Sequence, residues 1–159
     1  MDALLTAIVV WLSTNFGLPM DFEQPHIERV ASVEMATLRH RGLWPSRQRE
    51  AAVISGSTGS DVAAREVVAV YNDETATIYL ASDWQGRTPA ELSVLVHEMA
   101  HHLQARAGTK YECSAQHEKL AYEAQEKWLD LFGRSLESEF RIDGFALLIS
   151  TSCAMAILP

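Results

Sequence analysis

One stretch, Thr88-Pro-Ala-Glu-Leu-Ser-Val-Leu-Val-His-Glu-Met-Ala-His-His-Leu-Gln104, decides the fold because it combines a helix start, an apolar run and a histidine cluster. Thr88, followed by proline and, three residues on, by Glu91, has the pattern of a capping box with proline in the first turn. The apolar residues that follow predict a helix that reaches Gln104 and ends near Gly108. We therefore expect a well-started helix whose second half is rich in ionisable side chains.

The helix contains the motif His97-Glu-x-x-His101. Two histidines four residues apart on a helix lie about 40° apart around its axis, so both imidazoles can reach one ion. Catalytic zinc sites use three protein ligands and one open position, and bound zinc lowers the pKa of water to about 7. Glu98, one residue on, is then placed beside the ion as a general base.

A different interpretation is that the two histidines are merely solvated or hydrogen-bonded, in a sensor or interaction domain whose helix carries the motif by chance. The apolar run from Leu92 to Val96 argues against it. Ionisable residues that follow a buried stretch are costly unless they are used. We therefore expect His97 and His101 to bind one zinc ion.

A third ligand is expected from the next predicted helix, about residues 115–132, with Ser114 as N-cap and Gly133 closing it. Glu118 falls on the apolar face of this helix, whereas Glu123 falls about 140° away among charged residues. A carboxylate on an inward face needs a partner, while one among alternating charges is solvated. Glu118 is the preferred ligand, and the alternatives are Glu123, His117 or a more distant residue.

The rest of the chain predicts further helices and one β-hairpin. Valine, isoleucine, tyrosine and threonine on both sides of Asn72, Asp73 and Glu74 are typical of two paired strands. The predicted class is therefore α+β, mostly helical, with a small hairpin or sheet that borders the metal helix. The expected elements are helices over residues 3–16 and 32–42, a helical stretch over 136–157 that breaks near 144, strands over 67–71 and 77–80, and a loop at 55–60.

The length of 159 residues is that of one domain, residues 1–159. The net charge of −8, from 13 basic and 21 acidic residues, argues against a nucleic-acid binder, because phosphate neutralisation needs clustered basic side chains. It favours a neutral or basic peptide over an acidic one. The apolar ends are too short for a transmembrane segment, and the lack of a recognisable signal peptide favours the cytoplasm, although a trimmed leader would leave no trace.

Two cysteines, Cys113 and Cys153, are 40 positions apart. They are able to form a disulfide or to be two unrelated buried thiols, because the geometry of a disulfide cannot be read from spacing. Two cysteines are also far fewer than a disulfide-dense secreted scaffold contains. Both alternatives stay open at the level of the sequence.

Three other side chains near the motif are weaker candidates. His102 points about 140° away from His97 and cannot join the same ion. Gln104 falls on the ligand face and is able either to orient a ligand or to make a structural hydrogen bond. Tyr122, one turn after Glu118, is the phenol best placed to stabilise an oxyanion, although such tyrosines more often pack and bond locally. Tyr79 and Tyr111 are the next candidates for that role.

The stretch His97-Glu-Met-Ala-His101, followed by Glu118-Lys-Leu-Ala-Tyr122, resembles the gluzincin branch of zinc metallopeptidases. In that branch a second helix supplies a glutamate ligand in an E-x-x-A context. With H-E-x-x-H-H-L-Q ending at Gln104, the chain looks most like the small bacterial zincin-like domains, which are largely uncharacterised in function. No third histidine of the metzincin type follows the motif.

The resemblance covers about residues 67–131. It implies His97, His101 and Glu118 as ligands of one zinc ion and Glu98 as the general base. It also implies that the strand over 77–80 borders the cleft and pairs with an extended peptide.

We therefore expect a zincin-like zinc metallopeptidase that hydrolyses peptide bonds with metal-activated water. The alternative is a catalytically silent zinc-binding module that serves partner binding or stability, which the small size of the chain favours.

Overall fold

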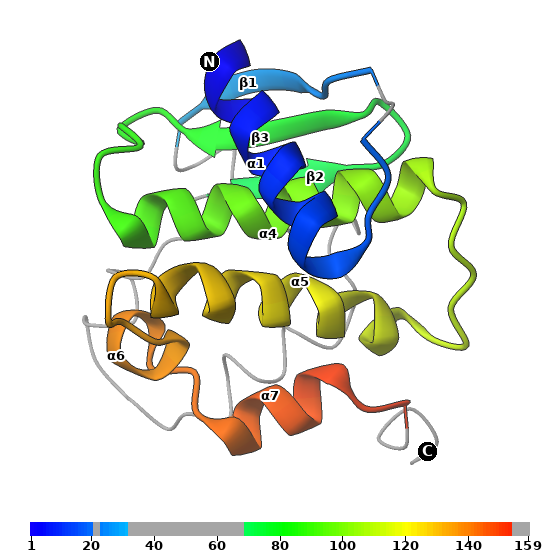
Figure 1. Cartoon of the computed structure of the whole chain (residues 1–159), viewed down its shortest axis with the longest axis vertical. Coiled ribbons are helices and arrows are strands. Elements are labelled where there is room, and N and C mark those ends of the chain that lie inside the picture. Colours follow the sequence, from blue (N-terminus) through cyan, green and yellow to red (C-terminus); the bar gives the residue numbers. More distant parts are fainter. Residues whose placement is uncertain (21–22, 32–68, 154–159) are drawn as a thin grey trace.

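The structure is a computed structural model and describes residues 1–20, 23–31 and 69–153. Helices and one small sheet pack together in these residues, so the predicted α+β class is confirmed (Figure 1). The helix predicted at 32–42 and the loop predicted at 55–60 lie outside the described residues. The elements are α1 (Asp2–Phe16), β1 (His26–Val30), β2 (Ala69–Asn72), β3 (Thr77–Ala81), α4 (Pro89–Arg106), α5 (Ser114–Asp130), α6 (Leu136–Phe140) and α7 (Gly144–Thr151).

The predicted hairpin is formed by β2 and β3, which pair antiparallel with Asn72 opposite Thr77. Asn72 holds the turn between them, because its Oδ1 accepts a hydrogen bond of 3.0 Å from the backbone N–H of Glu74. The turn ends at Ala76, whose φ of 49° lies in the left-handed region. Asparagine at the start of a turn commonly makes this local bond, which explains how the short connection forms.

The third strand, β1, was not predicted. It pairs in parallel with β3, with His26 opposite Thr77, and gives the strand order β1–β3–β2. Strand β3 is therefore central and has neighbours on both edges. The expectation that residues 77–80 pair with an extended peptide is wrong for this reason, since the hydrogen-bonding groups of both edges of β3 face strands of the chain itself.

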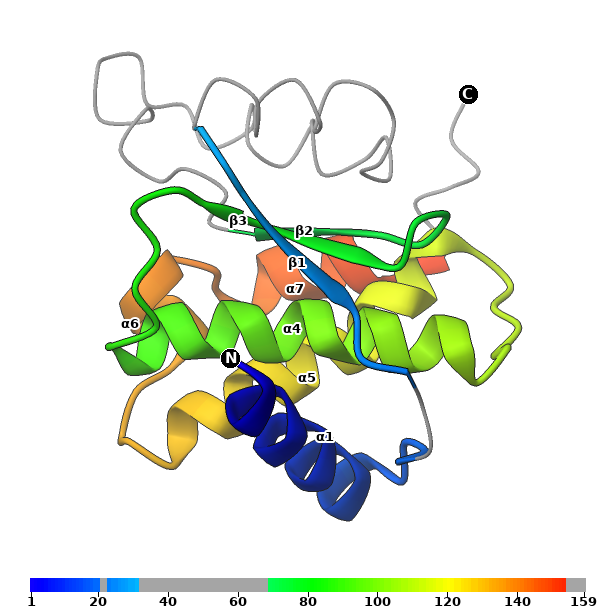
Figure 2. The same cartoon turned by 90° about the horizontal axis from the view of Figure 1, so that it is seen from above.

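Helix α4 starts as predicted and is buried along its second half. Thr88 Oγ1 accepts a hydrogen bond from the N–H of Glu91, whose carboxylate accepts one from the N–H of Thr88, so the capping box is confirmed. Every residue from Leu95 to Gln104 is buried. Figure 2 shows the reason: the sheet lies on one side of α4 and α1 on the other, while α5 runs alongside. Polar residues in such a helix need partners within the protein.

The apolar core joins α1, the sheet, α4 and α5. Leu5, Ile8 and Leu12 of α1 are buried, as expected for the predicted helix. Helix α5 begins at Ser114, but Cys113, not Ser114 as predicted, is the N-cap residue. The cluster also contains Val30, Ala69, Val70, Tyr71, Ile78, Leu80, Ala81, Trp84, Leu95, Val96, Met99, Ala100, Leu103, Ala121 and Ala124.

The predicted C-terminal helical stretch is two helices, α6 and α7. Helix α6 ends at Phe140, and its C-cap residue, Arg141, has a φ of 54°. Asp143 caps α7 by accepting a hydrogen bond from the N–H of Ala146. A disulfide between Cys113 and Cys153 joins the start of α5 to the chain just after α7. None of the helices in the described residues combines the length and apolar character that crossing a membrane requires.

Candidate metal centre

His97 and His101 lie one turn apart on α4 and turn their imidazoles toward the same point. Their Nε2 atoms are 3.1 Å apart, and the two rings meet edge to face. Both side chains are buried, with 6% and 7% of their surface exposed. The structure therefore brings the two predicted histidine ligands together.

Glu118 reaches the same point from α5. Its Oε2 lies 3.4 Å from Nε2 of His97, and its Oε1 lies 3.5 Å from Nε2 of His101. His97, His101 and Glu118 form a buried group that could hold a metal ion. Of the two carboxylates weighed from the sequence, the structure thus brings Glu118 to this group, while Glu123 is exposed and lines a surface pocket.

The spacing of these atoms fits a small divalent ion. Zinc bonds of about 2.0–2.1 Å in a tetrahedron place neighbouring ligand atoms about 3.3–3.4 Å apart. The two Nε2 atoms are 3.1 Å apart, and each lies near that edge length, at 3.4 and 3.5 Å, from a different oxygen of the Glu118 carboxylate. The three side chains therefore form a buried group that could hold one metal ion.

The charges of the group are strongly coupled. Burial lowers the pKa of His101, but the facing carboxylate of Glu118, with Glu98 and Gln104, outweighs it and raises the pKa to about 9. Burial raises the pKa of Glu118, yet His101 and His97 outweigh it and hold that pKa well below its ordinary value. Without an ion, a proton on His101 thus pairs with the Glu118 carboxylate at neutral pH.

Glu98 lies beside the metal group and is held by the sheet. Its Oε2 accepts a 2.8 Å hydrogen bond from the backbone N–H of Tyr71 in β2. Burial raises the pKa of Glu98, while the nearby His97 and His101 act in the opposite direction. A carboxylate with a raised pKa is suited to accept a proton near neutral pH. Sequence reasoning missed Tyr71, because its contribution is a main-chain N–H that only the register of the strands reveals.

His102 belongs to a separate network on the sheet side of α4, as its helical position predicts. Its Nε2 lies 2.9 Å from the backbone oxygen of Glu23, and its Nδ1 lies 3.2 Å from the phenol oxygen of Tyr71. A carbonyl only accepts, so Nε2 carries the proton and the phenol donates to Nδ1. Burial lowers the pKa of His102, which keeps the ring neutral. His102 thus ties β2 to α4 and takes no part in the metal group.

Gln104 and His117 support the ligand His101. Gln104 Oε1 lies 3.1 Å from Nδ1 of His101, and the ring of His117 stacks on the His101 ring with 4.4 Å between centroids. Tyr111 packs edge-on against His117. His117, the alternative third ligand, therefore packs against a ligand and is outside the group of three.

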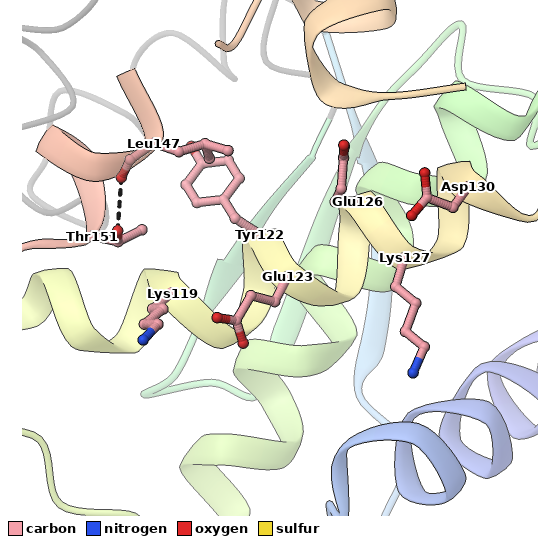
Figure 3. A pocket seen from close by; sticks show the side chains of 8 residues that line it. All are labelled: Lys119, Tyr122, Glu123, Glu126, Lys127, Asp130, Leu147 and Thr151. Atoms are coloured by element: carbon pink, nitrogen blue, oxygen red, sulfur yellow. Dashed lines mark hydrogen bonds between the residues drawn. The ribbon is translucent and has the colours of Figure 1, made fainter. Parts of the chain in front are cut away.

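Tyr122 lies between the metal group and a surface pocket. Its ring meets the ring of His97 edge to face at 4.7 Å, and Figure 3 shows it extending from α5 toward Leu147 of α7. The pocket, of about 360 Å³, is open and contains none of the three ligands. Its lining consists of Lys119, Tyr122, Glu123, Glu126, Lys127, Asp130, Leu147 and Thr151.

Comparison with known proteins identifies a family whose function is not known. No curated protein and no solved structure matches the chain significantly. One family matches residues 1–159, the whole chain, and its description is a domain of unknown function, DUF6647. On that match, the chain belongs to the DUF6647 family.

Proposed function

We propose that the chain is a zinc-dependent metallopeptidase in which His97, His101 and Glu118 hold one zinc ion and Glu98 is the general base. One observation carries the proposal: the ligand atoms of the three side chains converge, with contacts of 3.1–3.5 Å between each imidazole and its neighbours. This spacing suits tetrahedral zinc with bonds of about 2.0–2.1 Å.

The type of the ligands favours zinc over the harder cations. Calcium and magnesium prefer sets made only of oxygen atoms, whereas two imidazoles and a carboxylate suit zinc and neighbouring transition metals. Among the described residues, no fourth histidine, cysteine, aspartate or glutamate joins the group. Three protein ligands are typical of catalytic zinc sites, and four are typical of structural ones.

Glu98 supplies the acid–base chemistry in this proposal. A bound zinc ion would provide a Lewis acid and a water of lowered pKa. Glu98 takes the proton of the attacking water and later passes it to the leaving amine, while the N–H of Tyr71 keeps one carboxylate oxygen in place. Peptides are the proposed substrates because the two motifs resemble those of the gluzincins.

Tyr122 is the proposed stabiliser of the oxyanion that forms during hydrolysis. Its ring packs edge to face against the ring of the ligand His97, so Tyr122 lies beside the proposed site. Loss of one such donor lowers kcat by about 100-fold to 1,000-fold. Tyr122→Phe keeps the ring and removes the hydroxyl, so zinc binding should persist while hydrolysis falls; unchanged hydrolysis would remove Tyr122 from the mechanism.

A second candidate is a zinc-binding module without peptidase activity. The observation that favours it is the position of the pocket, which opens between α5 and α7 and does not include the three ligands. The ligands themselves are only 5–7% exposed. In this case zinc would stabilise the α4–α5 pair and the molecule would act by binding a partner.

Glu98→Gln distinguishes the two candidates. The purified variant and the wild type are loaded with zinc, their zinc content is measured by mass spectrometry, and cleavage of a peptide library is followed. If the chain is a metallopeptidase, both proteins should bind one zinc ion, and cleavage by the variant should be at least about 100-fold slower. Glu123→Gln is the control: it makes the same chemical change at an exposed position of α5, and this variant should cleave like the wild type.

Cleavage that survives in Glu98→Gln would refute the proposed base. His97→Ala tests the metal site separately, because removal of a ligand should abolish stoichiometric zinc; an unchanged zinc content would refute the ligand assignment.

A further inference from the structure

A buried glutamine, Gln104, bridges the two helices that supply the metal ligands. Only 1% of its surface is exposed. Its Oε1 lies 3.1 Å from Nδ1 of His101 in α4, and its Nε2 lies 3.1 Å from the main-chain oxygen of His117 in α5. His117 directly precedes the ligand Glu118, so one amide connects the anchoring of two ligands.

The chemistry of these partners fixes the direction of each hydrogen bond. The main-chain oxygen of His117 can only accept, so the NH₂ group of Gln104 must face it and donate. The amide oxygen of Gln104 then faces His101 and can only accept, so Nδ1 of His101 carries a proton. The Nε2 atom of His101, which faces His97 and Glu118, is thereby the nitrogen left to bind an ion.

We propose that Gln104 is a positioning residue for the metal: anchored on the main chain at His117, it holds His101 with Nδ1 protonated and Nε2 directed at the point shared with His97 and Glu118. The inference deepens the proposed function and rests on its metal site. It does not depend on peptide hydrolysis.

The surroundings of His101 support an orienting role. Its ring is stacked on the ring of His117, with an angle of 19° between the ring planes. The stacking fixes the plane of the His101 ring, and the hydrogen bond to Gln104 fixes which ring edge faces the ion. The other histidine ligand lacks this arrangement: Nδ1 of His97 is buried and has no hydrogen-bond partner among the described residues. Gln104 is thus specific to one ligand, and its loss should weaken binding of the ion without removing a ligand.

The experiment measures zinc affinity of the full chain by competition with a chromophoric chelator, with Zn²⁺ itself as the probe. Gln104→Met keeps the length of the side chain and removes both hydrogen bonds. We expect its zinc affinity to be about 10-fold to 100-fold weaker than that of the wild type, the range for loss of a residue that orients a ligand.

Gln125→Met is the matched control. Gln125 is also buried and also joins α5 to α4, but it donates to the hydroxyl of Ser93, at 3.3 Å, and not to a metal ligand. If Gln104 merely ties the helices together, both substitutions should change zinc affinity alike. The proposal requires that Gln125→Met bind zinc like the wild type.

Gln104→Glu provides a second test that does not rely on a loss. A carboxyl group at this position still offers an oxygen to Nδ1 of His101, in either protonation state. We expect its zinc affinity to lie closer to the wild type than to Gln104→Met. In the zinc-loaded wild type, ¹⁵N NMR should also show a His101 Nδ1 proton protected from exchange with water, and Gln104→Met should lose that protection.

Two results would overturn the inference: wild-type zinc affinity in Gln104→Met, or equal weakening in Gln104→Met and Gln125→Met. Neither result would touch the metal site itself. Failure of the wild type to bind zinc at all would instead defeat the site on which the proposed function rests.

Discussion

The two sides of α5 differ in how they are held. The side that faces α4 buries polar residues, and Glu118 and Gln125 each have partners across the interface. The side that faces α7 carries exposed charged residues and an open pocket, and no residue of α7 is buried. Figure 3 shows the pocket side, with Tyr122 extending from α5 toward Leu147 of α7.

Several of the buried polar groups of the molecule lie between α4 and α5. Burial of charged and polar groups is costly unless they are paired, so the α4–α5 side is shaped by its polar residues and by the ion that they are proposed to bind. Helix α7 keeps apolar residues in solvent, with Phe145 70% and Leu148 61% exposed. It therefore gains less from burial than the inner side does, and the Cys113–Cys153 disulfide adds a covalent tie between its end and the start of α5.

Removal of the disulfide is the strongest way to test this difference. A cross-link over a sequence separation of 40 residues stabilises a protein by about 4 kcal/mol in the chain-entropy account. We expect Cys153→Ser to lower the free energy of unfolding in urea by up to that amount. Hydrogen exchange should show α7 opening first, while zinc affinity stays unchanged. If the amides of α7 stay as protected as those of α5, then α7 does not depend on the disulfide.

Loss of the carboxylate on the inner side should abolish tight metal binding. Glu118→Gln keeps the shape of the side chain, and we expect zinc affinity to fall by more than about 100-fold, the upper end for loss of a supporting residue. Glu123→Gln makes the same change on the exposed side and should leave the affinity unchanged. Chelator competition measures both. Equal losses would mean that the two sides of α5 do not differ in function.

Much of the inner side could be predicted from the sequence, because helices α4 and α5 have clear periodicity. The capping box at Thr88 gave the correct start of α4, and the angular separation of Glu118 from Glu123 on α5 predicted which one turns inward. A regular helix fixes the direction of each side chain, so the argument needs no tertiary contact.

Other features depend on contacts between distant segments and had no local signal. Strand β1 pairs with a strand that follows it by about 50 residues, and four of its five residues are not buried, so it has no alternating pattern. The partner of Cys113 was undecidable because spacing does not report geometry. The hydrogen bond from Gln104 to the main chain of His117 depends on how α4 and α5 pack, and sequence reasoning could only name Gln104 as one alternative.

The stability of the metal-free protein should depend on pH through His101, on the side of α4 that faces α5. Because the pKa of His101 is raised from 6.5 to about 9, mainly by Glu118 against the effect of burial, protonated His101 stabilises the fold fully below pH 6.5. That contribution is lost as the pH rises through about 9. Zinc replaces the proton, so the zinc-loaded protein should lack this loss. Melting temperatures between pH 6.5 and 10, with and without a chelator, measure the effect; identical alkaline curves would contradict it.

The smallest effect is expected on the exposed face of α7. Leu148→Gln preserves helix propensity at a position that is 61% exposed, so the free energy of unfolding should change by less than about 0.5 kcal/mol. Leu129→Ala on the buried face of α5 should instead cost about 2–5 kcal/mol. Urea unfolding of both variants measures the two losses of unfolding free energy. A loss in Leu148→Gln that approached the loss in Leu129→Ala would show that α7 is held by packing, and the disulfide would then be secondary to it.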